Sequence, residues 1–220
     1  MIAQFVKFAL CLLCAVGVVH AVPIGETALV IGQSQLQRAQ AALPIIRGMP
    51  LEAGDTLQTS ANGHVHIRFR DGAFVSVRPN SRLIIEAYQF DPQSPQKSAI
   101  KFRLEQGVMR SITGRWGEAA RERFRLNTPL AAIGVRGTDF TVQASADQLR
   151  TTVNTGAIVV TPLGEDCQAE TIAPCATGKT QLLAADMGQW MLELTRREGK
   201  VRLVPLEELA PGERTVPLVE

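Results

Sequence analysis

Two histidines close together, His64 and His66, have the side chains that would bind a metal ion most readily in this chain. They are two positions apart, so an extended strand would direct both rings to one face. Zinc sites use three or four protein ligands. The remaining histidine, His20, lies in the apolar N-terminal segment, and Asp71 suits a turn with Gly72 better than it suits a ligand set. We therefore expect no metal site and no cofactor.

Acidic side chains could do acid–base chemistry on a polysaccharide, with Asp139, Glu105 and Glu122 as carboxylates and Arg136 beside them. That chemistry needs two carboxyl groups close in space, which sequence spacing does not show. Asp139 has a structural alternative, because aspartate beside glycine commonly fixes a turn through its side chain. We predict a non-enzymatic protein, and a polysaccharide-active enzyme is the less favoured alternative.

Motifs for nucleophilic catalysis and for nucleotide binding are incomplete. The sequence has no Gly-x-Ser-x-Gly segment. Gly178, Lys179 and Thr180 match the end of a phosphate-binding loop, but Ala173 occupies the position of its first glycine. The formal net charge of only +2 is not the clustered basic surface that nucleic acid requires. The sequence therefore predicts no nucleotide or nucleic-acid partner.

The N-terminus has the pattern of a secretory signal peptide, residues 1–21, with Lys7 before a short apolar run. The run is shorter than the ~20 residues that span a bilayer, so we expect no stable membrane span after cleavage; an uncleaved anchor is the alternative. Two cysteines, Cys167 and Cys175, remain in the mature chain. An even pair in an exported protein predicts a disulfide.

Alternating apolar residues predict β-strands over much of the chain. Phe102 and Leu104 form one inward set, and the others are Val65, Ile67 and Phe69, and Leu83, Ile85 and Ala87. Later strands are expected at 151–155, 157–161, 190–196 and 202–205. Turn residues recur every eight or nine positions, at Gly54–Asp55, Asn62–Gly63, Asp71–Gly72 and Pro79–Asn80. This spacing favours a sandwich, barrel or solenoid. Only residues 33–43, rich in Gln and Ala, favour a helix.

The segment Thr128–Phe140 is an apolar run interrupted by Gly134 and Gly137. Glycine within a strand pattern marks a bend, a bulge or a close approach of backbones. Arg136 comes directly before the second glycine, and Thr138 and Asp139 follow it. Arg136 and Asp139 could close a turn here by a charge-assisted hydrogen bond. We expect this motif to be structural, and we expect Gly137→Val to destabilise the fold.

Four blocks together resemble the FecR domain, named after the ferric citrate transport regulator. They are residues 54–59, 68–73, 79–83 and 128–140. The resemblance implies a periplasmic, all-β module, β-helix-like or a two-sheet roll built from short strands. It further implies protein partners in the cell envelope. Full-length regulators of this family also carry a cytoplasmic anti-sigma segment and a membrane helix. The N-terminal signal pattern here instead predicts a stand-alone form.

The predicted organisation is a signal peptide at 1–21, an N-terminal lead-in at 22–50, a FecR-like β domain at 51–161, and a disulfide loop with a C-terminal β extension at 162–220. We expect a periplasmic or extracellular protein-interaction or signal-sensing module. The alternative is a glycan- or peptidoglycan-binding module. Arginines on two segments could bind an acidic partner or an anionic glycan, or could simply be solvated strand faces: Arg68, Arg70, Arg78 and Arg82, and Arg121, Arg123 and Arg125.

Overall fold

The computed structural model describes residues 22–172, 175 and 177–208, and the predicted signal peptide lies outside these residues. The described residues form strands β1 (Gly25–Ile31), β2 (Ser34–Arg38), β3 (Ala41–Pro44), β4 (Pro50–Leu51), β5 (Thr56–Thr59), β6 (His64–Phe69), β7 (Phe74–Val77), β8 (Arg82–Gln89), β9 (Ala99–Ile112), β10 (Phe124–Asn127), β11 (Ala131–Ala144), β12 (Gln148–Pro162), β13 (Gln181–Ala184), β14 (Trp190–Thr195) and β15 (Val201–Pro205). Helix α1 (Arg115–Ala119) and short 3-10 turns at 95–97, 121–123, 185–187 and 206–208 complete them.

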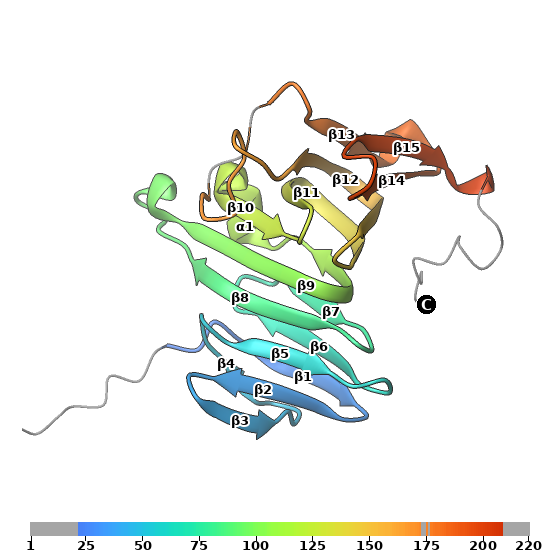
Figure 1. The fold of residues 1–220 in the computed structure, drawn as a ribbon. Helices are drawn as coiled ribbons and strands as arrows, with labels where there is room; N and C mark the ends of the chain where they lie inside the picture. Colours follow the sequence, from blue (N-terminus) through green and yellow to red (C-terminus); the bar gives the residue numbers. More distant parts are fainter. Residues whose placement is uncertain (1–21, 173–174, 176, 209–220) are drawn as a thin grey trace, which may run out of the picture.

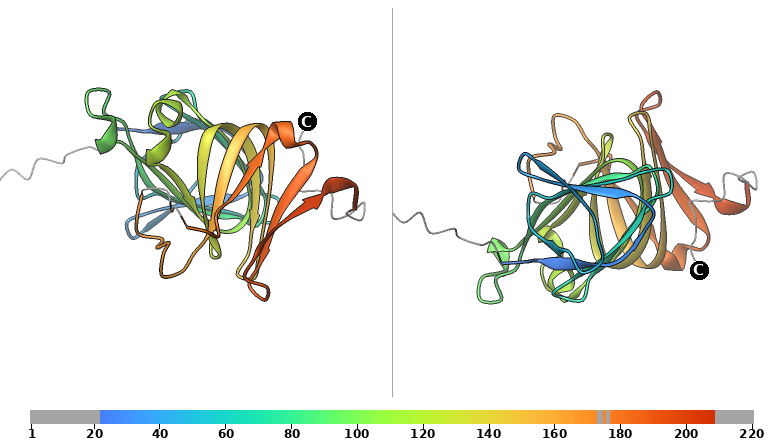
Figure 2. Two further views of the ribbon diagram at one scale, coloured as in Figure 1. Left: turned by 90° about the horizontal axis from the view of Figure 1, so that it is seen from above. Right: turned by 90° about the horizontal axis from the view of Figure 1, so that it is seen from below.

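The predicted all-β fold is confirmed. The strands join one 15-stranded sheet whose main path runs β15-β14-β12-β11-β10-β9-β7-β6-β1-β4 (Figure 1). Nearly all pairings are antiparallel, and only β9 and β10 run parallel. Viewed from below, the N-terminal half curls into a roll (Figure 2). The C-terminal extension consists of β13, β14 and β15, which continue the sheet from β12.

The roll arises because β9 is long enough to pair on both sides with different strands along its length. Its first half pairs with β8 and β10, and its second half pairs with β7 and β11. Two layers result, β3-β2-β5-β8 and β4-β1-β6-β7, and residues 22–50 contribute strands to both. Apolar side chains from the two layers fill the space between them, among them Leu36, Leu57, Val65, Ile67 and Leu83.

Most predicted inward residues are buried as expected, including Val65, Phe102 and Leu104. One set shifts. A register irregularity between Ile85 and Ala87 in the β8–β9 pairing reverses the alternation, so Tyr88 is buried in place of Ala87. A bulge inserts an extra residue and redirects the following side chains. The inward position predicted for Ala87 was therefore wrong.

The helix predicted over residues 33–43 was also wrong. The segment forms the hairpin β2–β3, with Leu36 paired to Leu43 on one side and to Leu57 of β5 on the other. Leu36 is fully buried, while Gln35 and Gln37 are exposed. Helix propensity is a weak preference, and burial of an alternating strand face overrides it. Within the part of the chain that the structure describes, no helix is long and apolar enough to cross a bilayer.

Candidate functional site

The glycine motif lies where β11 and β12 bend together. Gly137 has φ 64° and faces Gly156 of β12, which has φ 73°. The β11–β12 register shifts between Arg136 and Asp139, so the two strands carry a bulge at this point. Thr138 is buried in the bulge, and its amide donates to Thr113 Oγ1 at 3.2 Å while its carbonyl accepts from Thr113 N at 2.9 Å. These contacts support a structural role for the motif.

The expected pairing of Arg136 with Asp139 was wrong. Asp139 instead accepts two hydrogen bonds from Arg110 of β9, at 2.8 Å from Nε and 2.7 Å from Nη2, and Arg136 is exposed. The bulge turns the Asp139 carboxylate toward β9, where Thr141 of β11 pairs with Arg110. Hydrogen bonding to Asp139 raises the pKa of Arg110 above its usual value. The carboxylate therefore ties two strands together across the bend.

Two of the three candidate acid–base carboxylates, Glu105 and Asp139, have structural partners. Glu105 forms an ion pair with Arg82, and Arg82 Nε lies 2.6 Å from Glu105 Oε2. Asp139 forms the ion pair with Arg110 described above. Glu122 is exposed in the 3-10 turn at 121–123. The structure thus gives Glu105 and Asp139 ion-pair roles that do not require catalysis.

His64 and His66 project from the same face of β6, as the alternation predicts. Their Nε2 atoms are 3.0 Å apart, and His64 Nε2 lies 2.8 Å from Ser76 Oγ. Burial and the nearby Arg78 lower the pKa of both rings below the usual histidine value, with His66 adding to the effect on His64. Among the described residues, no group of three His, Cys, Asp or Glu side chains could hold a metal ion.

Asp71 has a larger role than the turn that the sequence predicts. It is buried, and its carboxylate accepts from Tyr88 Oη at 2.6 Å, Ala73 N at 3.1 Å and Trp116 N at 3.1 Å. The first contact reaches β8 and the last reaches α1. Burial, together with the adjacent Asp71, raises the pKa of Tyr88 above its ordinary value. The local Asp-Gly pattern gave no signal for these long-range contacts.

We expect Asp71→Ala to lower the free energy of unfolding by about 2–4 kcal/mol, because it leaves two buried donors and one partly buried donor without their acceptor. Tyr88→Phe, which removes only one of the three bonds, should cost about 1 kcal/mol. Urea unfolding followed by tryptophan fluorescence measures both. Equal stability of Asp71→Ala and the parent protein would contradict a fastening role for this carboxylate.

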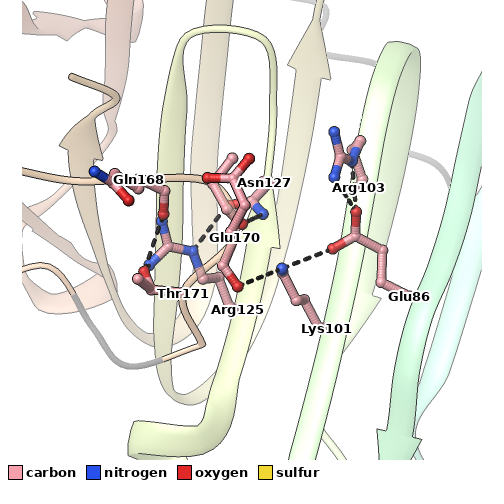
Figure 3. Close-up of polar contacts among 9 residues, drawn as sticks. Glu86, Lys101, Arg103, Arg125, Asn127, Gln168, Glu170 and Thr171 are labelled. Carbon is pink, nitrogen blue, oxygen red and sulfur yellow. Dashed lines mark hydrogen bonds and ion pairs between the residues drawn. The ribbon is translucent and has the colours of Figure 1, made fainter. Parts of the chain in front are cut away.

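The predicted disulfide between Cys167 and Cys175 is present, and its loop is held against the sheet by Arg125 of β10. Arg125 is only 2% exposed, although it was expected to lie on a basic outer face. It donates to Gln168 O at 2.7 Å, Thr171 Oγ1 at 3.0 Å and Asn127 Oδ1 at 2.8 Å. That expectation was wrong, because the disulfide loop covers the strand face that would otherwise be solvated (Figure 3).

The same guanidinium touches both sulfur atoms, with Nη1 3.3 Å from Cys175 Sγ and Nη2 3.6 Å from Cys167 Sγ. Desolvation lowers the pKa of Arg125, and the nearby Glu170 and Glu86 oppose this effect. A guanidinium stays charged at neutral pH even so. The buried cation therefore orders the loop by satisfying its carbonyl and hydroxyl oxygens.

Neighbouring side chains extend this network toward β8 and β9. Asn127 Nδ2 donates to Ala169 O at 2.7 Å, and Lys101 Nζ donates to Glu170 O at 3.1 Å. Lys101 also lies 3.0 Å from Glu86 Oε2, and Glu86 pairs with Arg103 as well (Figure 3). We call Arg125, Asn127, Lys101 and Glu86 the loop anchor. The anchor arises from residues far apart in sequence, so periodicity did not reveal it.

Comparisons with known proteins give a family match and a distant structural likeness. Residues 55–159 match a family model described as FecR protein. Two solved structures of a protein described as an anti-sigma factor from Parabacteroides distasonis share 16% and 15% identity with this chain, each with a TM-score of 0.47. Each alignment covers 68% of this chain and 59% of the other, so the chain spans under two thirds of that protein's length. No curated protein matches the chain.

Proposed function

We propose that this chain, which carries a FecR-like domain at residues 55–159, is a non-enzymatic protein-interaction or signal-sensing module of the bacterial cell envelope. The family match carries the proposal, because it extends from Asp55, just before β5, into β12 and so includes the bend, the ion pair of Asp139 and all four residues of the loop anchor. Family membership alone does not establish activity, and the residues of the site must support it.

The site supports binding over catalysis. Its charged side chains are used to join strands and to fasten a loop, as the pairs Arg110–Asp139 and Lys101–Glu86 show. The Cys167–Cys175 disulfide is in keeping with an oxidising compartment such as the periplasm. A rigid sheet with an ordered loop is the kind of scaffold on which a partner protein can dock without rearranging the domain.

Affinity capture from an envelope fraction tests the proposal. The purified full chain is immobilised, retained proteins are identified, and each is purified and titrated against the chain in isolation. We expect at least one envelope protein to bind again in this second step. A parallel sedimentation assay uses purified peptidoglycan. Cosedimentation with peptidoglycan, with no protein that rebinds, would overturn the proposal in favour of a glycan-binding module.

One feature favours that second candidate specifically. A hollow of about 540 Å³ lies beside the ends of β2, β3 and β5 and is lined largely by uncharged polar residues. Gln35, Gln58 and Ser60 are among them, with Pro44 and Ile45 as the apolar part. Amides and hydroxyls of this kind can bind sugar hydroxyls. If this hollow binds peptidoglycan, Gln58→Leu should weaken cosedimentation with peptidoglycan.

A further inference from the structure

We propose that the outer edge of β15 is the site where an extended segment of a partner protein adds to the sheet as a further strand. This inference rests on the proposed interaction function and names its surface. β15 is the last strand of the main sheet path, and among the described strands it pairs only with β14 (Figure 1). The opposite end of that path, β4, is only two residues long.

The register shows which backbone groups of β15 face outward. Leu206 N donates to Gln189 O at 2.9 Å, so these opposite residues form a hydrogen-bonded pair. In an antiparallel ladder, hydrogen-bonded and non-hydrogen-bonded pairs alternate. The pairs Met191–Val204 and Glu193–Arg202 are therefore hydrogen-bonded, whereas Leu203 and Val201 belong to non-hydrogen-bonded pairs.

The backbone groups of a residue in a non-hydrogen-bonded pair point away from its partner strand. The edge of β15 thus presents the N–H and C=O of Val201, the N–H and C=O of Leu203, and the C=O of Pro205. These groups have no partner strand within the described part of the chain, and a row of this kind is a template for another strand. Five groups are enough to fix the register of an added strand, because each pairs at a defined position.

The side chains of the same residues leave an apolar face incomplete. Val201 lies opposite Leu194, and Leu203 lies opposite Leu192. Leu194 and Leu192 are buried, whereas Val201 and Leu203 are only partly buried and pack against the core from its rim. A further strand with apolar residues at alternate positions would cover both rim residues. The backbone and the side chains therefore point to the same occupant.

Pro205 distinguishes a partner strand from a second copy of this chain. A symmetric antiparallel pairing of two β15 strands about Leu203 would place Val201 of each copy opposite Pro205 of the other. Proline has no N–H, so the Val201 carbonyl would remain unpaired at both ends. A partner strand without proline at that position satisfies every outward group. A pairing centred on Arg202 would satisfy the backbone groups of Val201 and Leu203 but would place the two Arg202 side chains directly opposite each other, and like charges in that position are destabilising. The geometry therefore favours an extended, non-proline segment of another protein.

Amide hydrogen exchange on the full chain, labelled with ¹⁵N at valine and leucine, tests this assignment. The probe is a capped synthetic peptide of alternating valine and threonine; its matched control carries N-methyl groups on the amides of one edge. We expect the probe to slow exchange at Val201 and Leu203 by about tenfold or more, while Val204, already bonded to β14, is unchanged.

Two results would overturn the assignment. The first is no change at Val201 and Leu203 at saturating probe. The second is protection of these amides in the protein alone. Protection that disappears on dilution would identify a second copy as the occupant, and protection that persists would identify a segment of the same chain, such as residues 209–220.

Leu203→Pro removes an outward donor and spares the β14 ladder, whereas Leu203→Ala keeps the donor and shortens the side chain. We expect the first to abolish binding of the probe and of a captured partner, and the second to weaken it several-fold. Val201→Lys, which keeps the backbone and adds a charge, covers the case in which the proline variant fails to fold. A partner that binds all three variants normally would refute the β15 site and leave the proposed function intact; absence of any partner for the parent chain would refute both.

Discussion

Replacing Arg125 by alanine should lower the free energy of unfolding by about 3–5 kcal/mol, because it removes several hydrogen bonds of a buried charged donor and leaves a cavity. The guanidinium is 2% exposed and donates to Gln168 O, Thr171 Oγ1 and Asn127 Oδ1. Alanine would leave the buried Asn127 Oδ1 without this donor, would remove the bonds that Arg125 makes to the loop at Gln168 O and Thr171 Oγ1, and would leave a cavity beneath the disulfide. These effects are destabilising, and all act on the folded state.

The loop should respond more strongly than the sheet. With Arg125 gone, we expect limited proteolysis to cut Arg125→Ala between β12 and β13 at least about tenfold faster than the parent, because only the bonds from Asn127 and Lys101 then fasten the loop to the sheet. Guanidinium chloride unfolding gives the global cost. Arg121→Ala is the matched control: Arg121 is exposed, and its loss should change stability by less than about 0.5 kcal/mol.

An Arg125→Ala protein as stable and as protease-resistant as the parent would show that the disulfide, Asn127 and Lys101 hold the loop without Arg125. Arg125→Lys refines the result. Lysine keeps the charge but lacks the planar fork that reaches several oxygens at once, so it should recover only part of the lost stability. Full recovery would mean that charge, and not the shape of the guanidinium, fastens the loop.

Sequence reasoning captured the features that depend on local pattern. Strict alternation placed Val65, Ile67 and Phe69 inward, and the even cysteine pair gave the disulfide. Turn residues also marked real reversals, since Gly54, Gly72 and Asn80 all have positive φ. In each case the necessary information lies within a few residues of the feature.

The errors share a cause, which is that a distant strand decides the outcome. The hairpin at 34–44 is set by β5 covering Leu36, and the burial of Tyr88 is set by the register irregularity of β8 against β9. Asp139 binds Arg110, a residue 29 positions away. The fold class was therefore accessible from the sequence, whereas the loop anchor and the partners of buried charges required the register of the sheet.

The bend between β11 and β12 should be the second point of high sensitivity, and its two glycines should respond differently. Both have positive φ, which costs an alanine about 1–2 kcal/mol. A Cβ on Gly137 would meet nothing within 4 Å, so Gly137→Ala should lose little beyond this strain. Gly137→Val should lose more, because β-branched residues tolerate positive φ poorly.

Gly156 has the same strain and a steric conflict in addition. A Cβ there would lie 2.1 Å from Gly137 O, a backbone atom that cannot move without disturbing β11. Overpacking of this kind costs about 1–3 kcal/mol more. Gly156→Ala should therefore lose about 2–5 kcal/mol, clearly more than Gly137→Ala, as measured by urea unfolding. Gly178→Ala, with open space around the site and no positive φ, is the control and should be nearly neutral.

The order of the two costs tests how the motif works. Equal losses for Gly156→Ala and Gly137→Ala would mean that the strands separate to admit the methyl group, and that only the backbone conformation of each glycine matters. A larger loss at Gly156 would mean that close contact of the two backbones holds the bend. In that case the motif acts as a pair across two strands, and Asp139 is placed toward Arg110 because β11 and β12 cannot move apart.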